Sequence, residues 1–135
     1  MRSSDALVES IARACEGLVV TSETDSDVSP VVFRAPRVTV IGREVVLALV
    51  GQDPATRCDE VSLREFFEPL GRRRDWHDRQ DAEMAQGFRR LERVLRRRLD
   101  KPRVFRIGDR SIEVFVLGRA RDGRVLGVRT SIVET

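Results

Sequence analysis

The sequence predicts an α+β fold, with a largely antiparallel central sheet flanked by helices. Much of the chain before residue 100 has apolar residues at three- and four-residue spacing, which is typical of amphipathic helices. The C-terminal third has apolar stretches separated by Gly108-Asp109 and Asp122-Gly123, which favours an antiparallel meander. With 135 residues, 41% of them hydrophobic, the chain is expected to form one domain spanning residues 1–135.

The N-terminal quarter is expected to form one helix and two short extended segments. Apolar residues share one face of a helix over residues 5–15, and residues 18–21 follow as an extended segment. Residues 22–27 are polar throughout and acidic, so we expect an exposed loop there. A short strand is expected at residues 31–34, because Pro36 cannot continue it.

Residues 38–50 allow two interpretations. Their first residues alternate as in a strand, whereas the apolar residues that follow repeat at helical spacing. Thr39 as a cap and Gly51 as a terminator favour the helix. The next stretch, residues 52–58, is expected to be a loop.

Two further helices are expected before residue 100. Ser62 and Glu65 have the spacing of a capping box, and Pro69 is expected to end the short helix that they begin. A longer helix is expected from Asp75 to about Asp100, with an apolar stripe along one face. The stripe consists of Met84, Phe88, Leu91, Leu95 and Leu99.

The last third of the chain predicts three strands, at residues 104–107, 112–117 and 125–133. The middle one is apolar on nearly both faces, with Glu113 as its one charged residue. A strand of this kind is expected at the centre of a sheet, covered by other elements on both sides.

The motifs of several enzyme classes are missing from the sequence. It has no glycine-rich phosphate loop, no HExxH motif and no nucleophile elbow. One histidine excludes a histidine-cluster metal site, and Cys15 and Cys58 match no metal or redox spacing. We therefore expect a protein that is not an enzyme and has no cofactor of its own. No apolar signal core or membrane-length segment is found, so a cytoplasmic location is expected.

Arginines gather on one side of the expected long helix, away from most of its apolar stripe. They are Arg89, Arg90, Arg93, Arg96 and Arg97. Such a row could follow a phosphate backbone, but an ordinary solvated helix face is the favoured interpretation. Lys101 is the only lysine, and this bias is typical of codon usage in a high-GC bacterium, which weakens any functional meaning of the arginine count.

Two further features bear on binding. Trp76, the only tryptophan, stands among charged residues, either as a half-buried residue at a helix start or as an exposed anchor for a protein partner. The chain ends in Glu134 and Thr135 directly after an expected strand. Their carboxylate and hydroxyl oxygens are hard ligands of the kind that magnesium or calcium prefers.

Several segments, taken in order, resemble the nuclease A inhibitor family, whose members block the active site of metal-dependent, sugar-non-specific nucleases. The Ser22-Glu23 loop and the Val133-Glu134-Thr135 terminus are the most specific of them. The matching segments are residues 16–23, Phe66-Phe67, Asp75-Trp76, and residues 103–108, 113–118 and 130–135.

The resemblance implies an α/β/α sandwich and a set of nuclease-binding residues. Glu23 would take the place of a substrate phosphate, and Thr135 would reach the magnesium of the partner nuclease, so that a Mg²⁺ ion is shared at the interface. Trp76 would be an interface aromatic, and Ser22 and Glu134 belong to the same contact set. The implied partner is a sugar-non-specific, magnesium-dependent nuclease, with no membrane partner and no direct binding of nucleic acid expected.

Two other functions fit the same residues. A protein-interaction module of this fold could have a different partner, as the net charge of +3 suggests. Alternatively, the arginine-rich helix face could bind nucleic acid directly, and such binding would weaken steeply with added salt.

Overall fold

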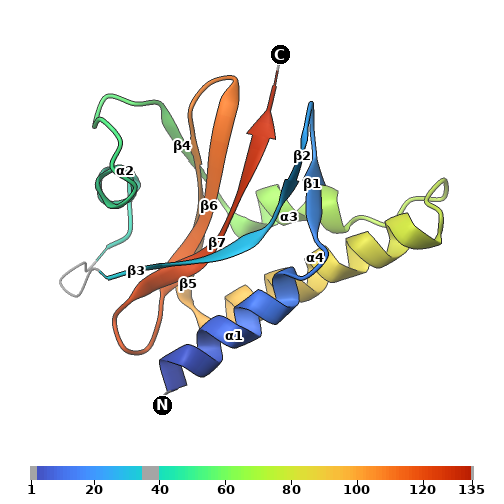
Figure 1. The fold of residues 1–135 in the computed structure, drawn as a ribbon, viewed down its shortest axis with the longest axis horizontal. Coiled ribbons are helices and arrows are strands. Elements are labelled where there is room, and N and C mark those ends of the chain that lie inside the picture. Colours follow the sequence, from blue (N-terminus) through green and yellow to red (C-terminus); the bar gives the residue numbers. More distant parts are fainter. Residues whose placement is uncertain (1–2, 35–39, 135) are drawn as a thin grey trace.

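The computed structural model describes residues 3–34 and 40–134, which form a mixed α+β fold (Figure 1). The helices of these segments are α1 (Ser3–Cys15), α2 (Arg43–Leu49), α3 (Leu63–Gly71) and α4 (Arg79–Arg98). The strands are β1 (Val19–Thr21), β2 (Asp25–Asp27), β3 (Ser29–Phe33), β4 (Cys58–Val61), β5 (Asp100–Ile107), β6 (Ser111–Arg119) and β7 (Val125–Val133).

The main sheet has five antiparallel strands in the order β3-β7-β6-β5-β4. The predicted meander is confirmed as β5, β6 and β7, and β6 lies at the centre of the sheet. Helices α1, α3 and α4 pack on one face of this sheet, and the short α2 packs on the other (Figure 1). Strands β1 and β2 form a separate two-stranded sheet.

Alternating side chains of β6 divide the apolar interior into two clusters. Val114 and Val116 belong to the larger cluster with α1, α3 and α4, whereas Phe115 and Leu117 belong to the cluster that α2 covers. Successive side chains of a strand point to opposite faces, so a strand that is apolar on both faces needs cover on both sides. This arrangement confirms the expectation drawn from residues 112–117.

The two best-defined helix starts are capping boxes. At α3, Ser62 Oγ accepts a hydrogen bond from the Glu65 N–H at 3.1 Å, as predicted, and the Glu65 carboxylate accepts one from the Ser62 N–H at 3.3 Å. At α4, the Asp78 carboxylate accepts a bond from the Asp81 N–H at 2.8 Å. The predicted start of this helix at Asp75 is therefore wrong, because the capping aspartate is the one three residues later.

Two element boundaries differ from the prediction in informative ways. Helix α3 continues through Pro69 to Gly71, which is buried against α4, and Arg89 of α4 donates a hydrogen bond to the Gly71 carbonyl. The expected loop at residues 22–27 is partly wrong, since β2 pairs with β1 there. The expected loop at residues 52–58 likewise ends where β4 begins.

Residues 38 and 39 of the ambiguous segment lie outside the described residues, but its later part is the helix α2. Gly42 occupies the N-cap position of this helix, with an extended backbone and no side-chain cap. The helical interpretation is thus confirmed for Arg43–Leu49, with the apolar residues Val46 and Leu47 buried against the sheet.

The two cysteines differ in their expected reactivity. Cys15 is buried on α1, and burial raises its pKa to about 11, whereas Cys58 is half-buried at the start of β4 and burial raises its pKa too. With this raised pKa, Cys15 stays protonated at pH 8. It is therefore unreactive, because the thiolate is the form that attacks a thiol reagent. We expect a thiol reagent at pH 8 to label Cys58 first and Cys15 only on unfolding, as measured by mass spectrometry. Equal labelling rates in the folded protein would contradict this burial of Cys15.

Candidate functional site

The turn between β1 and β2 is bound to the C-terminal end of β7. Ser22 Oγ accepts a hydrogen bond from the Val133 N–H at 3.0 Å, and the Glu23 N–H donates one to the Val133 carbonyl at 3.2 Å. Both backbone groups of Val133 are therefore paired with the turn. We call the turn Ser22–Thr24 together with Val133 and Glu134 the loop–tail edge.

Near the end of β7, serine hydroxyls accept the backbone hydrogen bonds that a neighbouring strand would otherwise accept. The ladder with β3 extends on β7 only as far as the pair Ser29–Arg129. Beyond it, the Ser131 N–H donates to Ser26 Oγ at 3.1 Å, and the Val133 N–H donates to Ser22 Oγ. Two serines four residues apart thus satisfy two donors on the same edge of β7, and they hold the β1–β2 hairpin against it.

Removal of the Ser22 hydroxyl tests this contact. We expect Ser22→Ala to lower the free energy of unfolding by about 1 kcal/mol, because the half-buried Val133 N–H loses its acceptor. Urea unfolding measures this loss, and the Val133 amide should exchange faster with deuterated water. Ser29→Ala is the matched control, since this exposed serine lies in β3 and, among the described residues, pairs only through its backbone. Equal stabilities of the two variants would argue against the contact.

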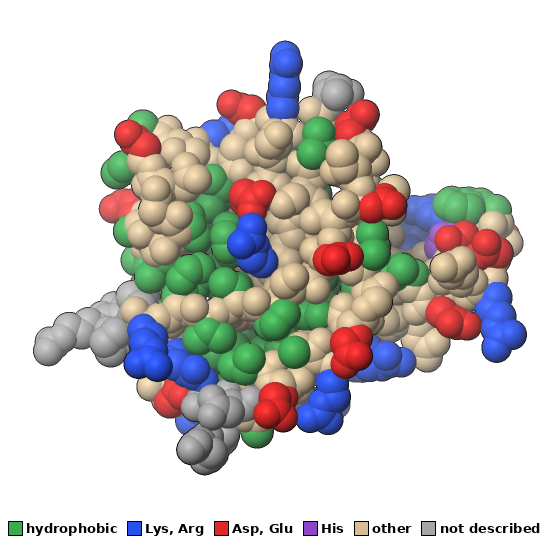
Figure 2. All heavy atoms as spheres, viewed as in Figure 1, with side chains coloured by type: hydrophobic (Ala, Val, Ile, Leu, Met, Phe, Trp, Pro, Cys, Tyr) green, Lys and Arg blue, Asp and Glu red, His purple; other side chains and the backbone are tan. Residues whose placement is uncertain are grey.

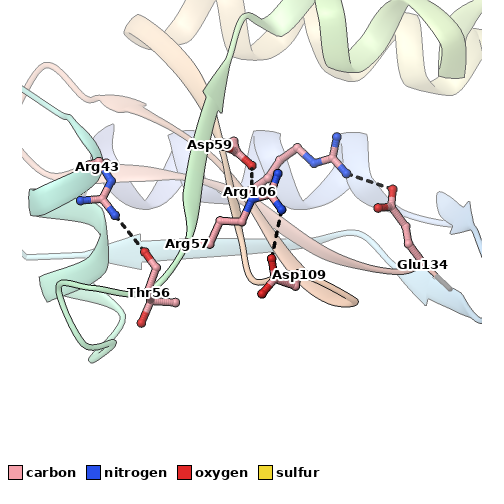
Figure 3. A network of polar contacts seen from close by, with 7 residues as sticks. All are labelled: Arg43, Thr56, Arg57, Asp59, Arg106, Asp109 and Glu134. Carbon is pink, nitrogen blue, oxygen red and sulfur yellow. Dashed lines mark hydrogen bonds and ion pairs between the residues drawn. The ribbon is translucent and has the colours of Figure 1, made fainter.

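Glu134, which follows Val133, is held by two interactions with residues of β5 and of the β5–β6 turn. Its N–H donates to the Arg110 carbonyl at 2.8 Å, and Arg106 of β5 donates to its carboxylate at 3.1 Å (Figure 3). The same region contains Arg57, which binds Asp59 at 3.1 Å and Asp109 at 3.0 Å. The hydrogen bond to Asp109, with the nearby charge of Asp59, raises the pKa of Arg57. Glu134, the last described residue, is thus held through its backbone bond to Arg110 and its side-chain bond to Arg106.

The loop–tail edge and the adjoining β2 strand carry exposed carboxylates. Glu23, Asp25, Asp27 and Glu134 are all exposed. Figure 2 shows several acidic side chains on the part of the surface formed by the β1–β2 hairpin. Carboxylates on a turn that is already fixed can meet a cation or hydrogen-bond donors of a partner without first being ordered.

Trp76 lies in the connection between α3 and α4, before the helix rather than within it. It is 75% exposed, and its ring packs edge-on against His77 with the centroids 4.7 Å apart. The Arg74 guanidinium carbon lies 5.9 Å from the tryptophan ring, and the Arg74 N–H donates to His77 Nδ1 at 3.3 Å. This exposure contradicts the half-buried interpretation, whereas the role of an anchor for a protein partner stays a prediction.

The structure thus brings together only some of the predicted site residues. Ser22, Glu23 and Glu134 belong to the loop–tail edge. Trp76 does not, because the α3–α4 connection lies well apart from the β1–β2 turn and the chain end (Figure 1). Thr135 lies outside the described residues. Sequence patterns did not reveal Ser26 and Arg106, whose contacts join positions distant along the chain.

The described part of the chain shows neither a metal-binding cluster nor a membrane-spanning helix. In residues 3–34 and 40–134, no group of three or more histidine, cysteine, aspartate or glutamate side chains could hold a metal ion. No helix in those segments is long and apolar enough to cross a membrane.

These observations define a small α+β protein that presents a fixed acidic turn beside the end of its sheet. Its sequence matches the nuclease A inhibitor-like protein family over residues 5–135, nearly the whole chain. The protein belongs to this family, which confirms the resemblance seen in the sequence and indicates a nuclease inhibitor. A comparison with curated proteins gave no match.

Proposed function

We propose that the protein inhibits a sugar-non-specific, magnesium-dependent nuclease by occupying its active site with the loop–tail edge. In this proposal Glu23 takes the position of a substrate phosphate. Thr135, which follows Glu134, supplies oxygen to the magnesium ion of the nuclease. Neither group offers a phosphodiester bond, so the nuclease has nothing to cleave.

The bonding of the acidic turn to the end of β7 is the observation that carries this proposal. Because Ser22 and Glu23 bond both backbone groups of Val133, the turn and the end of β7 meet a partner as one unit. A preformed binding element loses less conformational freedom on association than a mobile one. Ser22 and Glu134 accordingly act mainly by positioning Glu23 and Thr135.

Charge and ligand chemistry also support the proposal. A nuclease site holds a divalent cation and basic groups arranged around a phosphodiester, and charge-assisted hydrogen bonds to a carboxylate are strong in such a cleft. Magnesium prefers hard oxygen ligands such as carboxylate and hydroxyl groups. The exposed Trp76 would add a second, peripheral contact, since tryptophan is enriched among the residues that dominate interface energies.

Digestion of a plasmid and of an RNA by magnesium-dependent, sugar-non-specific nucleases, including one from the same organism, tests the proposal. Titration with the folded protein should protect both substrates, with an end point at one inhibitor per nuclease. A titration with a short substrate at high salt separates inhibition from any shielding of the nucleic acid itself. Undiminished digestion of both substrates at a large excess of folded protein would count against inhibition of these nucleases.

A further inference from the structure

The outer side of α4 carries three arginines that lack acidic partners among the described residues. Arg90, Arg93 and Arg97 are spaced three and four residues apart, so they lie along one side of the helix, and all three are exposed. Two other arginines of the same helix form ion pairs, Arg79 with Glu83 and Arg96 with Glu92. Within the segments that the structure describes, no carboxylate forms an ion pair with any of the three.

A groove of about 340 Å³ adjoins this row, between α3 and α4. Its charged lining consists of Arg64, Glu68, Arg72, Arg89, Glu92 and Arg96. Glu68 is bound to Arg72, whose hydrogen bond lowers the pKa of this carboxyl, and Glu92 is bound to Arg96 at 2.8 Å. Each glutamate is therefore matched by one arginine, and Arg64 and Arg89 remain in excess.

Positive charge is therefore concentrated on this part of the protein. The row and the groove, which we call the arginine surface, hold seven arginines and two glutamates, a surplus of five positive charges. This surplus exceeds the formal net charge of the whole chain, which is +3, so the remaining residues are net negative. The arginine surface lies on the three-helix side of the sheet, apart from the chain end (Figure 1).

We propose that the arginine surface binds the phosphate backbone of nucleic acid, while the loop–tail edge stays open to a protein partner. Arginine suits this ligand because its planar guanidinium binds phosphate oxygens in pairs. Arg90 and Arg97 are separated by about 10 Å along the helix, enough for the row to meet several phosphates. The described residues of this surface include no exposed aromatic ring on which bases could stack, so we expect contacts to the phosphate backbone rather than to unstacked bases.

The sequence favoured an ordinary solvated helix face without nucleic-acid binding. The structure instead favours phosphate binding, because it shows which arginines of this face are neutralised. The sequence shows five arginines on this helix without showing which are neutralised. In the structure Arg96 has an acidic partner and Arg89 bonds a backbone carbonyl, but the remaining three keep their full charge toward solvent.

Fluorescence anisotropy with a short labelled DNA duplex at low salt tests the proposal. The wild type should bind, and the triple variant Arg90→Ala, Arg93→Ala, Arg97→Ala should bind at least about tenfold more weakly. Its slope of log affinity against log salt should be smaller by two to three, since each phosphate contact contributes about 0.9. The matched control, Arg13→Ala, Arg103→Ala, Arg129→Ala, removes as much charge from arginines that have acidic partners, and it should keep most of the affinity.

Three results would overturn the proposal: no duplex binding by the wild type at low salt, an equal loss in the control variant, or binding to a polyglutamate chain without binding to DNA. The last result would indicate an acidic protein partner instead. Replacement of the same three arginines by lysine keeps the charge but not the paired hydrogen bonds, so this variant should bind more weakly than the wild type and more tightly than the alanine variant. The assay contains no nuclease, so its outcome is independent of whether the protein is an inhibitor.

Discussion

Glu23→Ala and deletion of Thr135 are each expected to raise the inhibition constant about 30-fold or more. Loss of a charge-assisted hydrogen bond, or of a dominant interface contact, costs about 2 kcal/mol, which corresponds to this factor. Glu23 is exposed in the β1–β2 turn, so its truncation should leave the fold intact. Inhibition is measured by titrating the nuclease at fixed magnesium, and unfolding curves of both variants should match the wild type.

Two further variants sharpen this experiment. Glu23→Gln keeps the shape of the side chain and removes its charge, so it should lose nearly as much inhibition as Glu23→Ala. Glu44→Ala removes an exposed carboxylate from α2, on the opposite face of the sheet, and should inhibit like the wild type. If Glu23→Ala and the protein without Thr135 both inhibit as strongly as the wild type, the proposed contacts are wrong.

Gly127→Ala is expected to destabilise the fold by about 3 kcal/mol or more. Gly127 lies in β7 between Val31 of β3 and Leu117 of β6. A Cβ atom there would overlap the carbonyl oxygen of Val116 and lie 2.9 Å from its carbonyl carbon. Both are backbone atoms, so no side-chain rotation relieves the overlap, and β6 and β7 must separate.

Urea unfolding of Gly127→Ala checks this expectation, with Gly42→Ala as the control. Gly42 has an extended backbone, and a Cβ atom added to it would meet no described atom within 4 Å, so its replacement should cost no more than about 1 kcal/mol at this N-cap. A Gly127→Ala protein about as stable as Gly42→Ala would contradict the close approach of the two strands. Loss of folded protein on expression would agree with it.

The elements that were predicted correctly are those in which the spacing of apolar residues matches the faces that are buried. The stripe that includes Phe88, Leu91 and Leu95 is buried on α4, and the continuous apolar run of β6 lies at the centre of the sheet. Strands β2 and β4 were missed because they are short and polar, and their structure depends on a neighbouring strand rather than on their own pattern. Pro69 did not end α3, because contacts with α4 hold the last turn in place.

The site was predicted less completely than the fold. The polar, acidic segment and the chain end were recognised from the sequence, and the family resemblance assigned both to one binding site. No sequence pattern, however, predicted the hydrogen bond between the Ser22 hydroxyl and Val133. The same holds for Arg106, which reaches Glu134 from β5 across the intervening β6 strand. Such contacts depend on strand order, and the order places positions close together that are far apart along the chain.

The serine hydroxyls along β7 also bear on how this surface can evolve. Because regular pairing with β3 stops at Arg129, the turn is attached to the sheet largely through two side chains and a few backbone bonds. Residues between these attachments, such as Thr24 and Asp25, are exposed and belong to neither apolar cluster. Their identities can therefore change from one lineage to another while the scaffold persists, so that the same fold can be refitted to nucleases with different active-site rims.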